Sequence, residues 1–199
     1  MNAHDPSPPS GYAIQSFEDF EADALRRIAP PPFVSKFRAI PWEDQDLPGP
    51  EHEWLVKYVI TRRERSMMVG ASQSGKSFLA IDLALAIARG VPWLGNRTTR
   101  GGVIYQAGEG GRGVKKRIRA YRNANGLGTD AKLPFVLMPA TLDLYGSDDQ
   151  TAAFVAEVKH WAGTFDVPLE LIVIDTLSAA TAGADENSSK DIGPVLARC

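Results

Sequence analysis

Short apolar runs, separated by glycine, proline and charged residues, recur along the chain from residue 51 onward. Some of these runs are bounded by turn residues and are as short as buried strands usually are. They are 66–69, 102–106, 134–138 and 169–175. Longer segments with helical spacing lie between them, at 78–89, 113–125 and 149–162. This alternation predicts an α/β fold in which helices cover both faces of a parallel sheet.

The predicted helices have recognisable ends. Residues 78–89 are apolar on nearly every face and meet no helix breaker before Gly90 and Pro92. Residues 149–162 end at Gly163 and carry their apolar side chains on one face, namely Phe154, Val155, Val158 and Trp161.

Two segments are harder to assign. Residues 54–61 fit either a strand or a helix that leads into the core. The last helix contains Pro194, and proline is tolerated at a first helical position but not deeper inside. We therefore expect this helix to begin near Pro194.

The first 50 residues differ from the rest of the chain. They hold nine of the fourteen prolines, and eight acidic against four basic side chains. Ser16 and Asp19 resemble the start of a short helix that would run to about Ala29. We expect residues 1–50 to be a proline-rich acidic arm and 51–199 to be the folded domain. The arm is either a flexible tether, which we favour, or a docking segment.

Composition narrows the class of protein. The formal net charge is −2, so overall charge does not indicate a nucleic-acid binder, although residues 51–199 are mildly basic. The only cysteine is Cys199, so one chain forms no internal disulfide, which suits a reducing compartment. No apolar stretch is long enough for a bilayer, and the first residues lack a signal-peptide pattern. We expect a cytoplasmic protein without a membrane partner.

Residues 70–77 read Gly-Ala-Ser-Gln-Ser-Gly-Lys-Ser, a complete G-x-x-x-x-G-K-[ST] phosphate-binding loop between a predicted strand and a predicted helix. Its glycines allow a tight turn and close approach to phosphate oxygens, and its backbone N–H groups form an anion cradle at a helix start. Lys76 would reach the β- and γ-phosphates, and Ser77 would bind Mg²⁺. The predicted ATP-binding residues are Gly70, Ala71, Ser72, Gln73, Ser74, Gly75, Lys76, Ser77 and Phe78.

Two carboxylates complete the candidate site. Asp175 follows four apolar residues, Leu171–Ile174, as the aspartate of a Walker B strand does. The carboxyl ends of parallel strands gather ligands, so Asp175 would hold Mg²⁺ opposite Ser77. Glu109 follows the strand at 102–106 in a glycine-rich turn, where it would orient or deprotonate the attacking water. The alternative for Glu109 is an ordinary solvated loop residue.

Six basic side chains crowd the helix that follows Glu109, at Arg112, Lys115, Lys116, Arg117, Arg119 and Arg122. One interpretation is that they contact DNA phosphates or a neighbouring subunit's nucleotide. The other is that they form a solvated helix face. Residues 179–189 are small and polar, and fit a connection better than a channel loop in a ring.

The combined motifs resemble one family. They are Gly70–Ser77 with Phe78-Leu-Ala, 90–95, 101–105 with 107–110, and 174–177 with 182–187. This set is similar to the RecA-like AAA-family ATPases related to RepA-type hexameric replicative helicases of phages and plasmids. The resemblance covers about residues 52–193. It implies a RecA-like P-loop fold, MgATP hydrolysis with Glu109 activating water, a hexameric ring and single-stranded DNA as partner.

The family pattern also contains strands beyond the Walker B segment, one of them between the phosphate-loop strand and the Walker B strand. The chain ends at Cys199, so we expect a sheet that is incomplete at the C-terminal side. The predicted function is MgATP binding and hydrolysis in a helicase-like DNA motor for phage or plasmid replication. The alternatives are a regulatory ATPase that does not translocate, and a truncated remnant without catalysis.

Overall fold

The computed structural model describes residues 36–37, 39–47, 52–109, 111–185 and 188–198. It divides into two units, Met1–Gly49 and Pro50–Cys199. Within the first unit, Trp42–Asp44 form the short 3₁₀ helix η1. The helix that we predict between Ser16 and Ala29 lies outside the described residues.

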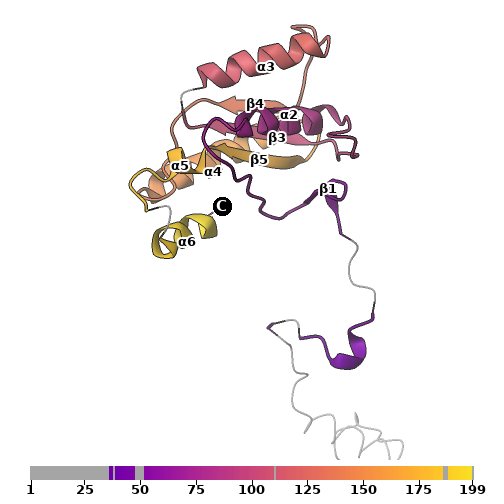
Figure 1. Cartoon of the computed structure of the whole chain (residues 1–199), viewed down its shortest axis with the longest axis vertical. Coiled ribbons are helices and arrows are strands. Elements are labelled where there is room, and N and C mark those ends of the chain that lie inside the picture. The colour runs from indigo at the N-terminus through magenta and orange to yellow at the C-terminus, as the bar shows by residue number, and fades with distance from the viewer. Residues whose placement is uncertain (1–35, 38, 48–51, 110, 186–187, 199) are drawn as a thin grey trace, which may run out of the picture. The chain divides into compact units, whose positions relative to one another are not determined.

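The larger unit is built on a parallel three-stranded sheet in the order β4-β3-β5 (Figure 1). Its strands are β3 (Gly102–Ala107), β4 (Phe135–Met138) and β5 (Leu169–Asp175). Every residue of the central strand β3 is buried. A strand that pairs on both edges and is covered on both faces is mostly apolar. The exception in β3 is the buried Gln106, whose Nε2 donates to the Ala140 carbonyl at 2.7 Å. The predicted α/β fold is confirmed.

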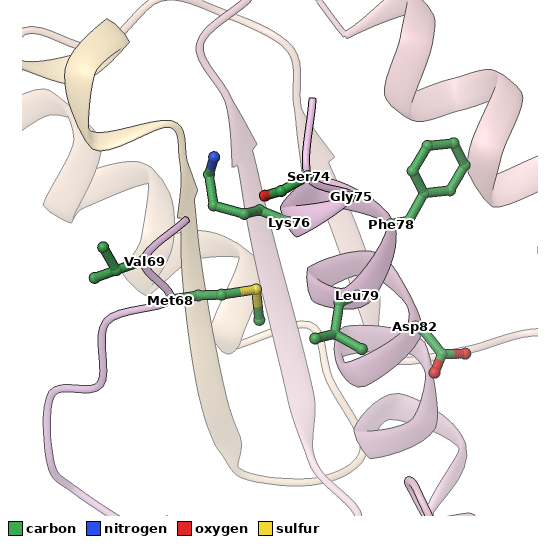
Figure 2. Close-up of a pocket in the computed structure, with 8 residues that line it drawn as sticks. All are labelled: Met68, Val69, Ser74, Gly75, Lys76, Phe78, Leu79 and Asp82. Carbon is green, nitrogen blue, oxygen red and sulfur yellow. The ribbon is translucent and has the colours of Figure 1, made fainter. Parts of the chain in front are cut away.

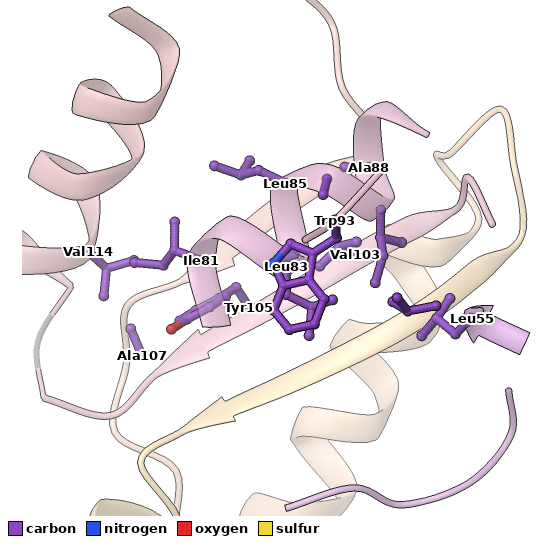
Figure 3. Close-up of a cluster of buried hydrophobic side chains, with 14 residues drawn as sticks. Leu55, Ile81, Leu83, Leu85, Ala88, Trp93, Val103, Tyr105, Ala107 and Val114 are labelled. Atoms are coloured by element: carbon purple, nitrogen blue, oxygen red, sulfur yellow. The ribbon is translucent and has the colours of Figure 1, made fainter. Parts of the chain in front are cut away.

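Helix α2 (Lys76–Arg89) packs against one face of the sheet. Its buried residues meet Val103, Tyr105 and Ala107, which point to this face because side chains alternate along a strand (Figure 3). Gly90 ends α2 in the left-handed conformation, with φ of 69°. Helix α3 (Arg112–Ala124) lies over α2 and contributes Val114, Ile118 and Tyr121 to the same core.

Helix α4 (Asp148–Ala162) covers the opposite face. Ser147 caps its N-terminus by accepting a hydrogen bond from the Gln150 N–H. Phe154, Val158 and Trp161 pack around Ile104 of β3, as predicted. Val155 does not, since it is 41% exposed. It lies one residue, about 100° of rotation, past Phe154, at the edge of the apolar stripe.

The ambiguous segment at 54–61 forms an antiparallel hairpin rather than a helix. Its strands are β1 (Trp54–Val56) and β2 (Ile60–Thr61). Leu55 and Val56 are buried in the same core as α2. The hairpin therefore belongs to the folded unit.

The prediction of a strand at 66–69 is wrong. No strand is assigned there, and Met67 and Val69 are 59% and 83% exposed. A strand exists only where a neighbour pairs with its backbone. The sheet ends at β5, whose Ile172 is 43% exposed. In the order implied by the family resemblance another strand separates the two segments, and none of the described residues occupies that place.

The expected start of the last helix near Pro194 is also wrong. Helix α6 spans Ser189–Arg198 and contains Pro194 in its interior. The proline removes one backbone hydrogen bond. The neighbouring Val195 is fully buried with Leu142, Leu144 and Ala180 of α5 (Leu177–Ala180). Tertiary packing therefore overrides the local preference. Among the described residues, no helix has the length and apolar character needed to cross a bilayer.

Candidate functional site

The phosphate-binding loop is a tight turn that leads directly into α2. Ser74 N–H donates to the Ala71 carbonyl at 3.2 Å, and Gly75 then takes φ of 90° before the helix begins at Lys76. A Cβ at Gly75 would meet no atom within 4 Å. Glycine is therefore required by backbone conformation and not by lack of space. Gln73 also has a positive φ, 62°, which is uncommon for a residue with a side chain and marks a constrained loop.

Lys76 lies along this loop. Its Nζ donates to the carbonyl oxygens of Gly70 and Ala71, each at 2.8 Å. A Cβ on Gly70 would lie 2.9 Å from Ser74 Oγ, so a larger residue there would require the Ser74 side chain to rotate. To contact a phosphate, the ammonium group would exchange these two carbonyls for phosphate oxygens. The side chain's flexible stem allows that exchange without movement of the backbone.

Ser77 and Asp175 meet at the carboxyl end of the sheet, although they are 98 positions apart in the sequence. Ser77 Oγ donates to Asp175 Oδ1 at 3.0 Å. The predicted juxtaposition of these two residues is thus present in the structure. A hydroxyl and a carboxylate are hard oxygen donors, the kind that Mg²⁺ prefers when phosphates supply further ligands. Among the described residues, no three His, Cys, Asp or Glu side chains form a metal site by themselves.

Tyr105 is a polar neighbour of this pair that the sequence analysis missed. Its hydroxyl donates to Asp175 Oδ2 at 2.7 Å, so Tyr105 and Ser77 each donate to a different oxygen of the carboxylate. Burial first, and then the hydrogen bond and negative charge of Asp175, raise the pKa of Tyr105 far above its usual 10, while the charge of Arg117 acts in the opposite direction. The hydroxyl is therefore a permanent donor at neutral pH.

Glu109 is exposed in the turn that follows β3. Ala107 is the register partner of Asp175, and the Gly108 N–H donates to the Asp175 carbonyl at 2.8 Å. A Cβ at Gly108 would lie 2.9 Å from the Cβ of Ala179, so glycine permits this close approach. The turn therefore places Glu109 at the same edge of the sheet as Asp175, two residues beyond its register partner.

A pocket of about 550 Å³ lies beside the loop (Figure 2). It is lined by Met68, Val69, Ser74, Gly75, Lys76, Phe78, Leu79 and Asp82. Ser77, Glu109 and Asp175 are not among its lining residues, so this cavity is distinct from the Ser77–Asp175 pair.

Phe78 follows Ser77 and points away from the Lys76 side chain (Figure 2). Its ring is 62% exposed and carries the Arg117 guanidinium 4.4 Å from its centre. Phe78 thus joins the start of α2 to α3 by a cation–π contact.

Residues 30–199 match the protein family described as the AAA domain. No curated protein and no solved structure gave a significant match to the chain. The family match covers most of the chain, including the phosphate-binding loop, Glu109 and Asp175. It implies nucleotide binding and ATPase activity, which in such proteins is typically Mg²⁺-dependent. The chain therefore belongs to the AAA domain family of RecA-like P-loop ATPases.

Proposed function

We propose that this protein binds MgATP through residues 70–78 and hydrolyses it at the carboxyl edge of the sheet. The observation that carries the proposal is the hydrogen bond between Ser77 and Asp175, because it joins the loop motif to the Walker B aspartate. Backbone N–H groups of 71–77 and the Lys76 ammonium would bind the phosphates. Ser77 and Asp175 would hold Mg²⁺, which neutralises charge on the β- and γ-phosphates when bound.

Glu109 is the proposed catalytic carboxylate. Its turn lies beside Asp175, and an exposed carboxylate retains the freedom to approach a water in line with the γ-phosphate. In this scheme the water donates a proton to Glu109 while its oxygen attacks the γ-phosphorus. The bond from that phosphorus to the β–γ bridging oxygen breaks, ADP leaves with the electron pair, and Lys76 stabilises the charge that develops on the phosphates. The proposed ATPase domain is 51–199, with residues 1–50 as its arm.

The biological role that we propose is a helicase-like DNA motor, active in the cytoplasm as a hexameric ring in phage or plasmid replication. Its support is the resemblance of the combined motifs, especially Ala107-Gly-Glu109 and Ile174-Asp-Thr176, to RepA-type replicative helicases. Coupling would require that single-stranded DNA accelerate hydrolysis. An ATPase that is indifferent to DNA would instead fit a regulatory switch.

The test is calorimetric titration of MgATP into the full chain, followed by phosphate-release assays with and without single-stranded DNA. Lys76→Ala should lose nucleotide binding, whereas the exposed Lys132→Ala serves as a matched control and should bind normally. Glu109→Gln should keep binding and lose about 10²-fold or more in turnover. Binding by Lys76→Ala equal to that of the control would refute the assigned phosphate site. Unchanged turnover in Glu109→Gln would refute only its catalytic role.

A further inference from the structure

We propose that the exposed cationic face of α3 is a docking surface for the phosphate backbone of single-stranded DNA. The face is formed by Arg112, Lys115, Lys116 and Arg119. This inference rests on the proposed function and deepens it, because it assigns the DNA contact to particular residues.

The charge of α3 is one-sided. Its thirteen residues include six arginines and lysines and no acidic residue. The four residues of the cationic face are exposed, and none of them forms an ion pair with another described residue. Their positive charge is therefore available to a partner.

The arrangement is unfavourable for the helix itself. Arg112 and Lys116, and likewise Lys115 and Arg119, are like charges four residues apart, each pair costing a few tenths of a kcal/mol. Arg112 also places a positive charge in the first turn, where the helix dipole favours a negative one. A local pattern that opposes folding without a compensating contact is typical of a functional surface.

The opposite face of α3 holds the helix in place. Val114 is buried, and Ile118 and Tyr121 pack against the core around α2. The Tyr121 hydroxyl accepts a hydrogen bond from Arg89 Nη1 at 2.8 Å. The cationic side chains therefore project from a fixed support.

The chemistry of the surface favours nucleic acid over an acidic protein. The cationic face presents charge without large exposed apolar side chains, whereas a protein partner normally needs an apolar or aromatic anchor. Phosphate-backbone binding needs only cations. From Arg112 to Arg119 the helix rises about 10 Å, enough to meet two or three successive phosphates of one strand.

The helix that carries this surface is linked to the nucleotide site at two points. Arg112 is three residues from Glu109, and Arg117 on the same helix contacts Phe78, which follows Ser77. A strand held on α3 would therefore contact an element attached to both the catalytic turn and the phosphate-binding loop. This gives a physical route by which DNA would alter ATP turnover.

The test measures binding of a fluorescent single-stranded oligonucleotide by anisotropy at several salt concentrations. The variant Lys115→Gln/Lys116→Gln/Arg119→Gln removes three charges from the surface. The control Lys132→Gln/Lys159→Gln/Lys190→Gln removes three charges from exposed positions elsewhere. For single strands each phosphate contact contributes about 0.7 to the slope of log affinity against log salt. We expect the first variant to lose about 2 in slope and about 100-fold in affinity at 0.1 M salt. The control should keep the wild-type slope.

Several outcomes overturn the proposal. Equal slopes for the two triple variants would refute the α3 surface while leaving DNA binding intact. No oligonucleotide binding by the wild-type chain would refute both this surface and the DNA-motor function. If that chain still bound ATP, the ATPase assignment would be unaffected. Binding restricted to one base sequence would contradict a backbone contact. Retained ATP binding shows that a variant is folded. The single variant Lys116→Gln should show about one third of the change in the salt-dependence slope that the triple variant shows.

Discussion

Removing the hydroxyl of Tyr105 tests how Asp175 is held in position. The phenol donates to Asp175 Oδ2 at 2.7 Å, while Ser77 donates to Oδ1 at 3.0 Å. Tyr105→Phe deletes the first bond and keeps the ring, which packs in the core near Phe135 with 6.4 Å between ring centres. The substitution leaves no buried donor without an acceptor, and it frees one oxygen of a carboxylate that is only partly buried.

The magnitude follows from the charge of the acceptor. A hydrogen bond to a charged group contributes about 1.5–3 kcal/mol, and part of that is recovered because water reaches the freed carboxylate oxygen. We expect Tyr105→Phe to raise the Mg²⁺ concentration at half-saturation of nucleotide binding about 10-fold, equivalent to about 1.4 kcal/mol. Affinity for nucleotide without Mg²⁺ should stay near the wild-type value.

The assay is a titration of Mg²⁺ at fixed nucleotide, with Tyr121→Phe as the matched control. Tyr121 also loses a hydroxyl that is hydrogen-bonded, to Arg89 at 2.8 Å, but it does not contact Asp175. A general loss of stability would move both variants alike. Equal Mg²⁺ half-saturation for Tyr105→Phe and Tyr121→Phe would therefore refute the role of Tyr105 in positioning Asp175.

Three further predictions concern stability and the loop. The pKa of Tyr105 is raised in the folded state, so above pH 10 the unfolded chain loses this proton before the folded chain does. The free energy of unfolding should therefore fall by up to about 1.4 kcal/mol per pH unit there. Denaturant titrations across pH 9–11 should show that Tyr105→Phe lacks this part of the pH dependence. Gly75→Ala places a side chain at φ of 90°, so it should lower the free energy of unfolding by about 1–2 kcal/mol and weaken nucleotide binding. The control Gly113→Ala places a Cβ in open space within α3, so thermal unfolding should show no loss of stability. Arg62→Ala removes the guanidinium whose Nε donates to Glu170 Oε2 at 2.8 Å and should cost about 2–3 kcal/mol; if a double variant with Glu170→Gln is no less destabilised than the sum of the two single variants, the two residues are not coupled.

Local signals predict most of the fold. The strand at 169–175 has the bounds expected from sequence, and α2 ends at Gly90 as its breakers indicate. These signals act within a few residues, through apolar runs, caps and glycine conformations. The strand expected at 66–69 fails because pairing depends on a neighbour that a local pattern does not reveal. Pro194 misleads for a related reason, since burial of the adjacent Val195 decides the extent of α6.

The candidate site divides in the same way. The spacing of 70–77 and the apolar run before Asp175 predict which residues belong to the site, and the parallel sheet explains why Ser77 and Asp175 meet. The role of Tyr105 is not predicted from the sequence, because a tyrosine inside an apolar strand is usually a packing residue. A usable signal exists, since Tyr105 lies two residues before the register partner of Asp175 and on the face that α2 covers. A hydroxyl-bearing residue at that position of a neighbouring strand is a candidate partner for a Walker B aspartate.

The position of β3 explains why these residues act together. This one strand carries the Tyr105 hydroxyl that contacts Asp175, and its end leads through Glu109 into α3. The start of α3 is constrained, because Gly111 has φ of 64° and a Cβ there would lie 2.4 Å from the Cβ of Pro139. DNA bound to the cationic face of α3 would therefore act on a helix whose first residues are closely packed. If DNA binding alters hydrolysis, Glu109 is where the effect should act, and Glu109→Gln should abolish stimulation by DNA while leaving DNA affinity unchanged.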